Sequence, residues 1–198
     1  DVAAIAAQVQ VEMLEAGFAA VGEFHYLHHA PGGRRYAEPA AMSSAIAEAR
    51  AQTGIGLTHL PTLYSRGGVD DRPCAGGQLR FANDIDGFAE LLHAIETALA
   101  DLPADCRLGV AAHSLRAVRA DDVTALVALR PGVPLHIHAA EQMAEVEAVE
   151  AALGARPVAW LLDNQPVDTS WCLVHATHTT PAETEALAAT GAVAGLCP

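Results

Sequence analysis

The chain has 198 residues, which is enough for one domain, or part of a larger one, with a sizeable core. Hydrophobic residues make up 52% of it and charged residues 18%, a composition that excludes a disordered chain. The 24 acidic residues outweigh the 11 basic ones, all Arg, and the formal net charge of −13 opposes binding to nucleic acid or to an anionic membrane and favours a cytoplasmic protein.

The elements predicted along the chain alternate between helices and short apolar strands. The first helix is expected at residues 5–14 and ends near Gly17. The capping box Thr180-Pro181-Ala182-Glu183 begins the last helix. Between and beyond these lie, in chain order, strand 19–24, helix 39–52, strand 56–60, a Gly-rich loop 65–80, helix 85–100, strand 108–112, helix 121–129, strand 135–138, helices 143–153 and 157–162, strand 172–174 and, after the last helix, strand 192–196.

Strands that alternate with helices indicate parallel βα units, and near-continuous apolar strands fit a sheet that is covered on its faces. Most of the expected strands end in His or another polar residue, as strands do at the catalytic face of a (β/α)8 barrel. An open doubly wound sheet is the alternative, but it normally has a Gly-rich phosphate loop after its first strand, and residues 22–25 (GEFH) are no such loop. We therefore predict an α/β fold, a (β/α)8 TIM-type barrel.

Six strands do not close an eight-stranded barrel. We expect residues 1–198 to form part of a catalytic barrel domain, about strands 2 to 7, without the regions of strands 1 and 8 or any small flanking β domain. The N-terminus has neither an initiator Met nor the basic region of a signal peptide, so the chain is expected to begin inside a longer protein. No apolar run reaches the roughly 18 residues needed to span a bilayer.

The four cysteines are scattered, with no Cys-x-x-Cys spacing: Cys74, Cys106, Cys172 and Cys197. This pattern argues against a disulfide framework or a thiolate zinc site. We expect free, buried thiols in a reducing compartment.

The strand 135–138 and the residues after it are the most informative stretch. Side chains alternate along a strand, so His136 and His138 should face the same way, opposite to Leu135 and Ile137. Imidazole is the commonest protein ligand for zinc, and a carboxylate just beyond it, here Glu141, can handle the protons of a metal-activated water. The alternative is a buried strand with two hydrogen-bonded histidines and an unrelated surface Glu.

Polar side chains follow four of the expected strands and should meet at one end of a barrel. They are Tyr26 after strand 19–24, His113 and Arg116 after 108–112, His138 and Glu141 at and beyond the end of 135–138, and His175 after 172–174. Three His at successive strand ends favour a shared site. The planar fork of Arg116 suits a carboxylate, although its spacing slightly favours a solvated Arg opposite Asp121 or Asp122.

The remaining histidines and helix acids are expected to lie outside the site. We expect the loop histidines to be solvated: His25, His28 and His29. No functional role is predicted for His59, His93, His178, Glu145, Glu147 and Glu150.

With these residues placed, the chain resembles the amidohydrolase superfamily of metal-dependent deaminases and, within it, the formimidoylglutamate deiminase family. Four segments carry the likeness, in order and across nearly the whole chain: 23–29 (EFHYLHH), 109–116 (GVAAHSLR), 135–142 (LHIHAAEQ) and 173–178 (LVHATH). The resemblance implies hydrolytic deimination of N-formimino-L-glutamate to N-formyl-L-glutamate and ammonia, a step of histidine degradation.

The resemblance also implies roles for the strand-end residues. His138 matches a metal ligand, Glu141 the proton shuttle, and His175 the residue that assists the attacking water or the tetrahedral centre. The implied cofactor is one divalent metal ion, with zinc favoured over iron. The implied partners are a small-molecule substrate and a second copy in a homodimer.

Three further residues match substrate-contacting positions of the family. They are His113 and Arg116, with Arg116 on a glutamate carboxylate, and, as a weaker match, Tyr26. Two family features are missing, since no His-x-His precedes residue 19 and no Asp of an eighth strand follows. Because a catalytic metal needs about three protein ligands, this stretch alone is expected to be inactive.

Two rival functions stay open. One is another deaminase of the superfamily, acting on guanine or an adenosine-type thioether. Such an enzyme needs an aromatic pocket for the purine, and aromatic residues make up only 5% of this chain, which argues against this alternative. The other is a non-catalytic barrel fragment that serves as a binding module.

Overall fold

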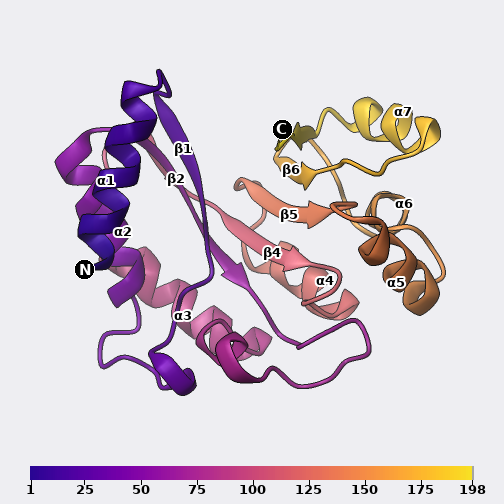
Figure 1. The fold of residues 1–198 in the computed structure, drawn as a ribbon, viewed down its shortest axis with the longest axis horizontal. Helices are drawn as coiled ribbons and strands as arrows, with labels where there is room; N and C mark the ends of the chain where they lie inside the picture. Colours follow the sequence, from indigo (N-terminus) through magenta and orange to yellow (C-terminus); the bar gives the residue numbers. More distant parts are fainter. Residues whose placement is uncertain (198) are drawn as a thin grey trace.

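The computed structural model describes residues 1–197 and shows a curved parallel β-sheet with helices packed along its outer side (Figure 1). The strands are β1 (Ala20–His25), β2 (Gly56–Leu63), β3 (Cys106–Leu108), β4 (Val110–Ser114), β5 (Leu135–Ala139), β6 (Trp171–His175) and β7 (Val193–Gly195). The helices are α1 (Val2–Glu15), α2 (Ala41–Thr53), α3 (Ile85–Ala98), α4 (Ala120–Leu129), α5 (Met143–Leu153), α6 (Pro157–Asn164) and α7 (Pro181–Thr190). Two short 3-10 helices, η1 (Pro31–Gly33) and η2 (Gly76–Arg80), lie in the loops after β1 and β2.

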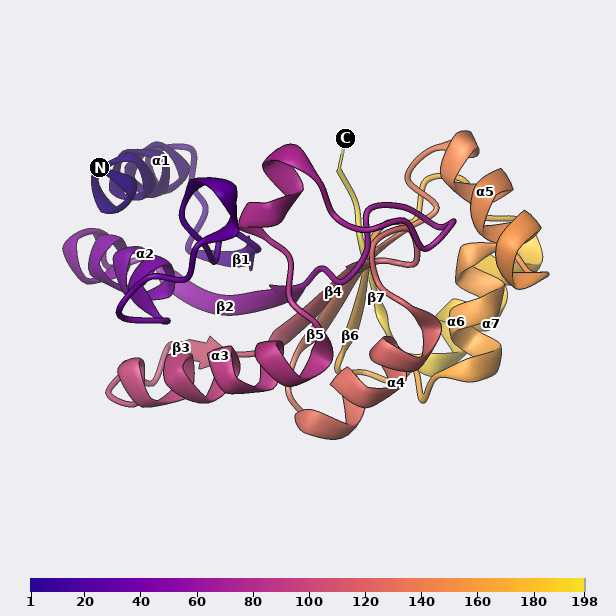
Figure 2. The ribbon, with the colours of Figure 1, turned by 90° about the horizontal axis from the view of Figure 1, so that it is seen from below.

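The sheet order is β1-β2-β4-β5-β6-β7, with every neighbouring pair parallel and β3 attached to β2. The helices follow one another in an arc around this sheet (Figure 2). This arrangement confirms the predicted incomplete (β/α) barrel. Because all the strands are parallel, their carboxyl ends lie at one edge of the sheet, where a barrel of this kind carries its functional residues.

The number of strands differs from the prediction of six, because β3 is an additional strand. Gly109 separates β3 from β4, and its N–H donates to the carbonyl of His59 at 2.9 Å. A Cβ at this position would lie 2.4 Å from the carbonyl oxygen of Pro134, so only glycine fits between the two strands. At its other end β4 extends to Ser114, so His113 lies inside the strand, not after it.

The core lies between the sheet and the helices, and strand alternation determines which side chains enter it. In β5, Leu135 is 3% and Ile137 is 0% exposed, whereas His136 and His138 on the other face are half-buried. This confirms the predicted faces of the strand. On the helix side, α3 presents an apolar stripe centred on Phe88 to the same core.

The prediction that the loop histidines are solvated was wrong. Both His28 and His29 are buried, and their backbone N–H groups donate to the carbonyl of Arg80 at 3.1 and 2.9 Å. The His28 ring bonds the carbonyl of Thr62 at 3.0 Å, and the His29 ring bonds Asn83 Oδ1 at 3.1 Å. The loop is buried because η2 and the end of β2 pack against it.

Three of the buried imidazoles form a cluster between β1, β2 and the loop that follows β1. The ring centroid of His25 lies 5.0 Å from that of His59 and 5.5 Å from that of His28. Burial, followed by the neighbouring imidazoles, lowers the pKa of each of the three to about 3. All three are therefore neutral in the folded protein at physiological pH.

All four cysteines are free, as predicted, but only Cys172 is buried. Cys74 and Cys106 are half-buried and Cys197 is exposed, so the expectation of four buried thiols was wrong. Within residues 1–197, none of the helices combines the length and the apolar character needed to cross a bilayer.

Candidate active site

Three imidazoles lie side by side at the carboxyl ends of neighbouring strands. His113 is in β4, His138 in β5, and His175 is the last residue of β6. The ring centroids of His113 and His138 are 5.0 Å apart, and those of His138 and His175 are 5.3 Å apart. The predicted convergence of these residues is thus observed.

His138 is held in one orientation and one tautomer. Its Nδ1 lies 2.8 Å from the carbonyl oxygen of His113. A carbonyl can only accept, so Nδ1 carries the proton and Nε2 keeps a free lone pair. Burial lowers the pKa of His138, which keeps the ring neutral, and the Phe24 ring packs against it with centroids 4.1 Å apart. This is the state in which an imidazole binds a metal ion.

Arg116 and Glu141 form an ion pair across the ends of β4 and β5. Arg116 Nη2 donates to Glu141 Oε2 at 2.6 Å. The slightly favoured alternative, a solvated Arg116 opposite Asp121 or Asp122, is therefore wrong, and Arg119 takes the place beside Asp122.

The same contacts control the charge of Glu141. Burial raises the pKa of this carboxyl, but the hydrogen bond and charge of Arg116, together with His175, outweigh burial and bring the pKa below its usual value. His175 Nε2 lies 3.7 Å from Glu141 Oε1. Glu141 is thus a carboxylate at neutral pH, with an imidazole and a guanidinium beside it.

The backbone at these two strand ends adopts a conformation that side chains disfavour. The φ angles are +53° at Ala140, +73° at His175 and +49° at Ala176. The two turns are tied together, because the N–H of Ala176 donates to the carbonyl of Ala139 at 3.0 Å and that of His178 to Ala140 at 2.9 Å. Strained, well-braced backbone of this kind is concentrated at functional sites.

Tyr26 lies beside the imidazoles, together with two aromatic residues that the sequence reasoning missed. The Tyr26 ring centroid is 5.5 Å from that of His113 and 4.8 Å from that of Phe81. Tyr64 also packs against His113, with centroids 4.8 Å apart. Tyr64 directly follows β2, which extends to Leu63 and not to residue 60 as predicted, and only with this longer strand would the strand-end rule that selected Tyr26 have selected Tyr64.

The site borders an open cavity of about 350 Å³. Its lining includes Tyr64, His113, Arg116 and Ala117, together with Gly67 and Val69 of the loop after β2. A small polar molecule fits this volume, and Arg116 gives its wall a positive charge. His136 does not line this cavity and instead lines a separate one with Trp171 and Pro134.

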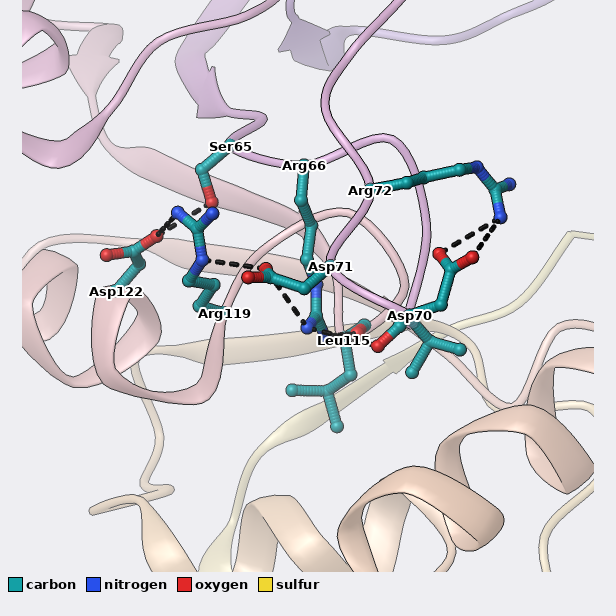
Figure 3. Close-up of polar contacts among 9 residues, drawn as sticks. Ser65, Arg66, Asp70, Asp71, Arg72, Leu115, Arg119 and Asp122 are labelled. Carbon is teal, nitrogen blue, oxygen red and sulfur yellow. Dashed lines mark hydrogen bonds and ion pairs between the residues drawn. The ribbon is translucent and has the colours of Figure 1, made fainter.

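The loop after β2 forms hydrogen bonds with the backbone on both sides of Arg116, and Figure 3 shows Arg66 beside Leu115 on one of these sides. The N–H groups of Ser65 and Arg66 donate to the carbonyl of Ala117 at 2.8 and 3.0 Å. The buried guanidinium of Arg66 donates from Nη2 to the carbonyl of Leu115 at 2.6 Å. The carbonyls before and after Arg116 are thus both held by this loop.

Polar and charged side chains also connect this loop to the segment that follows Arg116. Arg119 Nε donates to Asp71 Oδ1 at 2.7 Å, and Ser65 Oγ donates to Asp122 Oδ2 at 2.7 Å (Figure 3). Asp71 also lies 3.8 Å from the guanidinium of Arg66. The network joins the loop after β2 to the segment that carries Arg116.

Arg66→Met is expected to lower the free energy of unfolding by about 2–4 kcal/mol, because it leaves the buried carbonyl of Leu115 and the half-buried carbonyl of Val69 without their donor. Urea denaturation measures this change. The control is Arg35→Met, which removes an exposed Arg paired with Glu90 and should change stability by about 1 kcal/mol at most. Equal losses in the two variants would contradict the bracing role of Arg66.

The donor set fits a metal ion only in part. His138 presents a free Nε2 of the right chemistry, with the carboxylate of Glu141 and the ring of His175 nearby. Within the described part of the chain, no group of three or more His, Cys, Asp or Glu side chains could hold a metal ion. These residues therefore supply one ligand and the groups around it.

Comparison with known proteins identifies relatives of the whole chain. Residues 1–198 match the family model described as "Amidohydrolase family". A formimidoylglutamate deiminase of Pseudomonas aeruginosa is 50% identical over 194 residues, which are 98% of this chain and 42% of that protein.

Solved structures agree with this match. An amidohydrolase from Brucella melitensis superposes with a TM-score of 0.96 at 48% identity, over 99% of this chain and 44% of that one. An adenosine deaminase from Xanthomonas campestris with bound zinc superposes with a TM-score of 0.69 at 22% identity, over 95% of this chain and 38% of that one, which shows a shared fold alone. The chain spans less than half the length of each of these proteins.

Proposed function

The chain belongs to the amidohydrolase family, and from this we propose that the full-length protein hydrolyses N-formimino-L-glutamate to N-formyl-L-glutamate and ammonia. The family and the deiminase relative support a hydrolase that acts on C–N bonds. One observation carries the finer proposal: Arg116, a group suited to a carboxylate, lies 2.6 Å from Glu141, a group suited to proton transfer. A substrate that joins a carboxylate to an amidine fits this pair.

Glu141 moves the proton in this mechanism. As a carboxylate it takes a proton from the attacking water and delivers it to the imino nitrogen. It then transfers the proton of the new hydroxyl to the same nitrogen, so that the formyl C=O forms as the C–N bond breaks and ammonia departs. His175, with Nε2 at 3.7 Å from Glu141 Oε1, stands beside the tetrahedral centre and assists the same transfer.

Arg116 anchors a carboxylate of the substrate with its planar fork, which positions the amidine carbon near Glu141. The substrate carboxylate competes with Glu141 for the Arg116 guanidinium. When the substrate takes this partner, the proton affinity of Glu141 rises, at the stage of the reaction in which Glu141 must hold the proton. Burial, followed by the charges of His138 and Arg116, lowers the pKa of His113 to about 3, so this ring stays neutral. It offers a hydrogen bond to the substrate, as does the Tyr26 hydroxyl.

His138 would hold one divalent metal ion through Nε2, since its Nδ1 is committed to the carbonyl of His113. We propose zinc, which the Xanthomonas deaminase contains, with iron as the alternative. Such an ion, when bound, acts as a Lewis acid and lowers the pKa of a water to about 7.

Arg116→Met is expected to lower kcat/KM for N-formimino-L-glutamate by about 10- to 100-fold, because it removes a charged hydrogen-bond donor to the substrate. It should also move the acid limb of the kcat/KM profile to higher pH. The sign follows from the ion pair, since Arg116 lowers the pKa of Glu141 and its removal lets that pKa rise. Ammonia release measured across pH checks both effects, and an unshifted acid limb would contradict the pairing.

The proposed function is tested by the rate of ammonia release from the full-length protein loaded with zinc. N-formimino-L-glutamate, guanine and an adenosine thioether are compared at equal concentration, with a chelator-treated sample as control. We expect release from N-formimino-L-glutamate alone. Faster release from guanine or the thioether would favour the rival deaminase, and release from none of the three would favour a binding module.

A further inference from the structure

Glu145 in α5 is a buried carboxylate whose partners are backbone groups. It is 2% exposed, and no ion pair reaches it within residues 1–197. Its Oε1 accepts the N–H of Ala140 at 3.2 Å, and its Oε2 accepts the N–H of Glu141 at 2.8 Å. No functional role was predicted for this helix acid. A carboxylate is removed from water at considerable cost, so its position calls for an explanation.

Helix capping does not explain the contact. Glu183 has the corresponding place in α7, the third helical position, and it bonds the N–H of its own N-cap residue Thr180 at 2.8 Å as an ordinary capping box does. Glu145 reaches past its N-cap residue Gln142 to the two residues before it. It therefore holds the turn after β5.

That turn determines where Glu141 lies. Ala140 has a φ of +53°, a left-handed conformation that an alanine rarely adopts without support. The two hydrogen bonds to Glu145 fix the amides of this residue and the next. With the turn fixed, the carboxylate of Glu141 is placed 2.6 Å from Arg116 Nη2 and 3.7 Å from His175 Nε2.

We propose that Glu145 is a positioning residue that holds the backbone of Glu141, and that deimination depends on it through Glu141. The inference rests on the proposed function, in which Glu141 carries the proton. It differs from a purely structural role because it predicts a loss in turnover greater than the loss in stability explains.

The test uses the full-length, zinc-loaded protein. Glu145→Gln keeps the length of the side chain but replaces one acceptor oxygen with an NH2 group, which cannot accept an N–H. We expect kcat to fall about 10- to 100-fold while KM stays close to the wild-type value, because Arg116 still binds the substrate. Glu145→Asp, which retains the charge but is one methylene shorter, should recover part of the loss.

Glu183→Gln is the control, since Glu183 is also a buried acid at the third position of a helix, although it pairs with Arg156 Nε at 3.1 Å. It should lower stability in urea and leave kcat nearly unchanged. The positioning role is overturned if Glu145→Gln lowers kcat no more than Glu183→Gln does, or if it raises KM alone.

Amide hydrogen exchange gives a readout that does not need activity. In Glu145→Gln the amides of Ala140 and Glu141 should exchange about 10-fold faster or more than in the wild type, relative to the amides of the neighbouring strand. Unchanged protection would overturn the inference. An inactive wild type with protected amides would instead contradict the proposed function, and with it the catalytic part of this role.

Discussion

Glu141→Gln in the full-length protein is expected to lower kcat for deimination by about 10²- to 10⁴-fold. The amide is nearly the same size as the carboxylate, so the packing around it is preserved. It cannot take the proton of the attacking water or return it to the leaving nitrogen, however. Removing this charge also releases Arg116 from its partner at 2.6 Å, so substrate binding should be retained or tightened.

The measurement is steady-state ammonia release, with KM and kcat determined separately. Glu147→Gln serves as the control, because Glu147 is an exposed acid six residues further along the chain, in α5 and outside the site. A Glu141→Gln protein that retains full activity would show that another group carries the proton.

A shift from about pH 7 to about pH 5 is expected to remove several kcal/mol of stability, because the folded protein keeps His25, His28 and His59 neutral. The pKa of each is lowered from 6.5 to about 3. Below pH 6.5 these three imidazoles bind protons in the unfolded chain but stay unprotonated in the folded one. The stability is therefore fully present above this value and falls as the pH drops toward 3. At pH 5 the loss is on the order of 2 kcal/mol for each residue.

Urea denaturation at several pH values between about 5 and 7.5 measures this loss. His59→Leu supplies the comparison, because both ring nitrogens of His59 are buried without a hydrogen-bond partner and an apolar side chain suits the same surroundings. The free energy of unfolding of the variant should fall less steeply as the pH drops, because unfolding of the variant takes up about one proton fewer than unfolding of the wild type. A pH-independent wild type over this range would contradict the neutral cluster.

Local signals in the sequence predicted most of the fold and several of the residues that meet at the candidate site. The capping box at Thr180 predicted the start of α7, and alternation predicted that His136 and His138 share a face of β5. Both features depend on residues a few positions apart. The convergence of His113, His138 and His175 followed from one further rule, that parallel strands present their carboxyl ends at the same edge.

The features that were missed depend on contacts between distant segments. β3 is three residues long and forms against β2, and the break at Gly109 reflects the approach of Pro134. His28 and His29 are buried because their backbone N–H groups donate to the carbonyl of Arg80, a residue about fifty positions later in the chain. A polar loop sequence gives no sign of either contact.

The site itself shows the same limit. Spacing along the chain pointed Arg116 toward the nearby Asp121 or Asp122, whereas its partner is Glu141 in the turn after β5. The role of Glu145 depends on the left-handed turn at Ala140, and no residue type in that segment predicts such a turn. The carboxylate beyond His138 was predicted, but its orientation could be obtained only from the structure.

The fate of the two C–N bonds of the formimino group tests the central claim most directly. The full-length, zinc-loaded protein is incubated with N-formimino-L-glutamate in oxygen-18 water, and the products are identified by mass spectrometry. We predict ammonia and N-formyl-L-glutamate that carries the water oxygen on its formyl carbon. Formamide with free glutamate, or a formyl group without the label, would contradict hydrolytic deimination at this site.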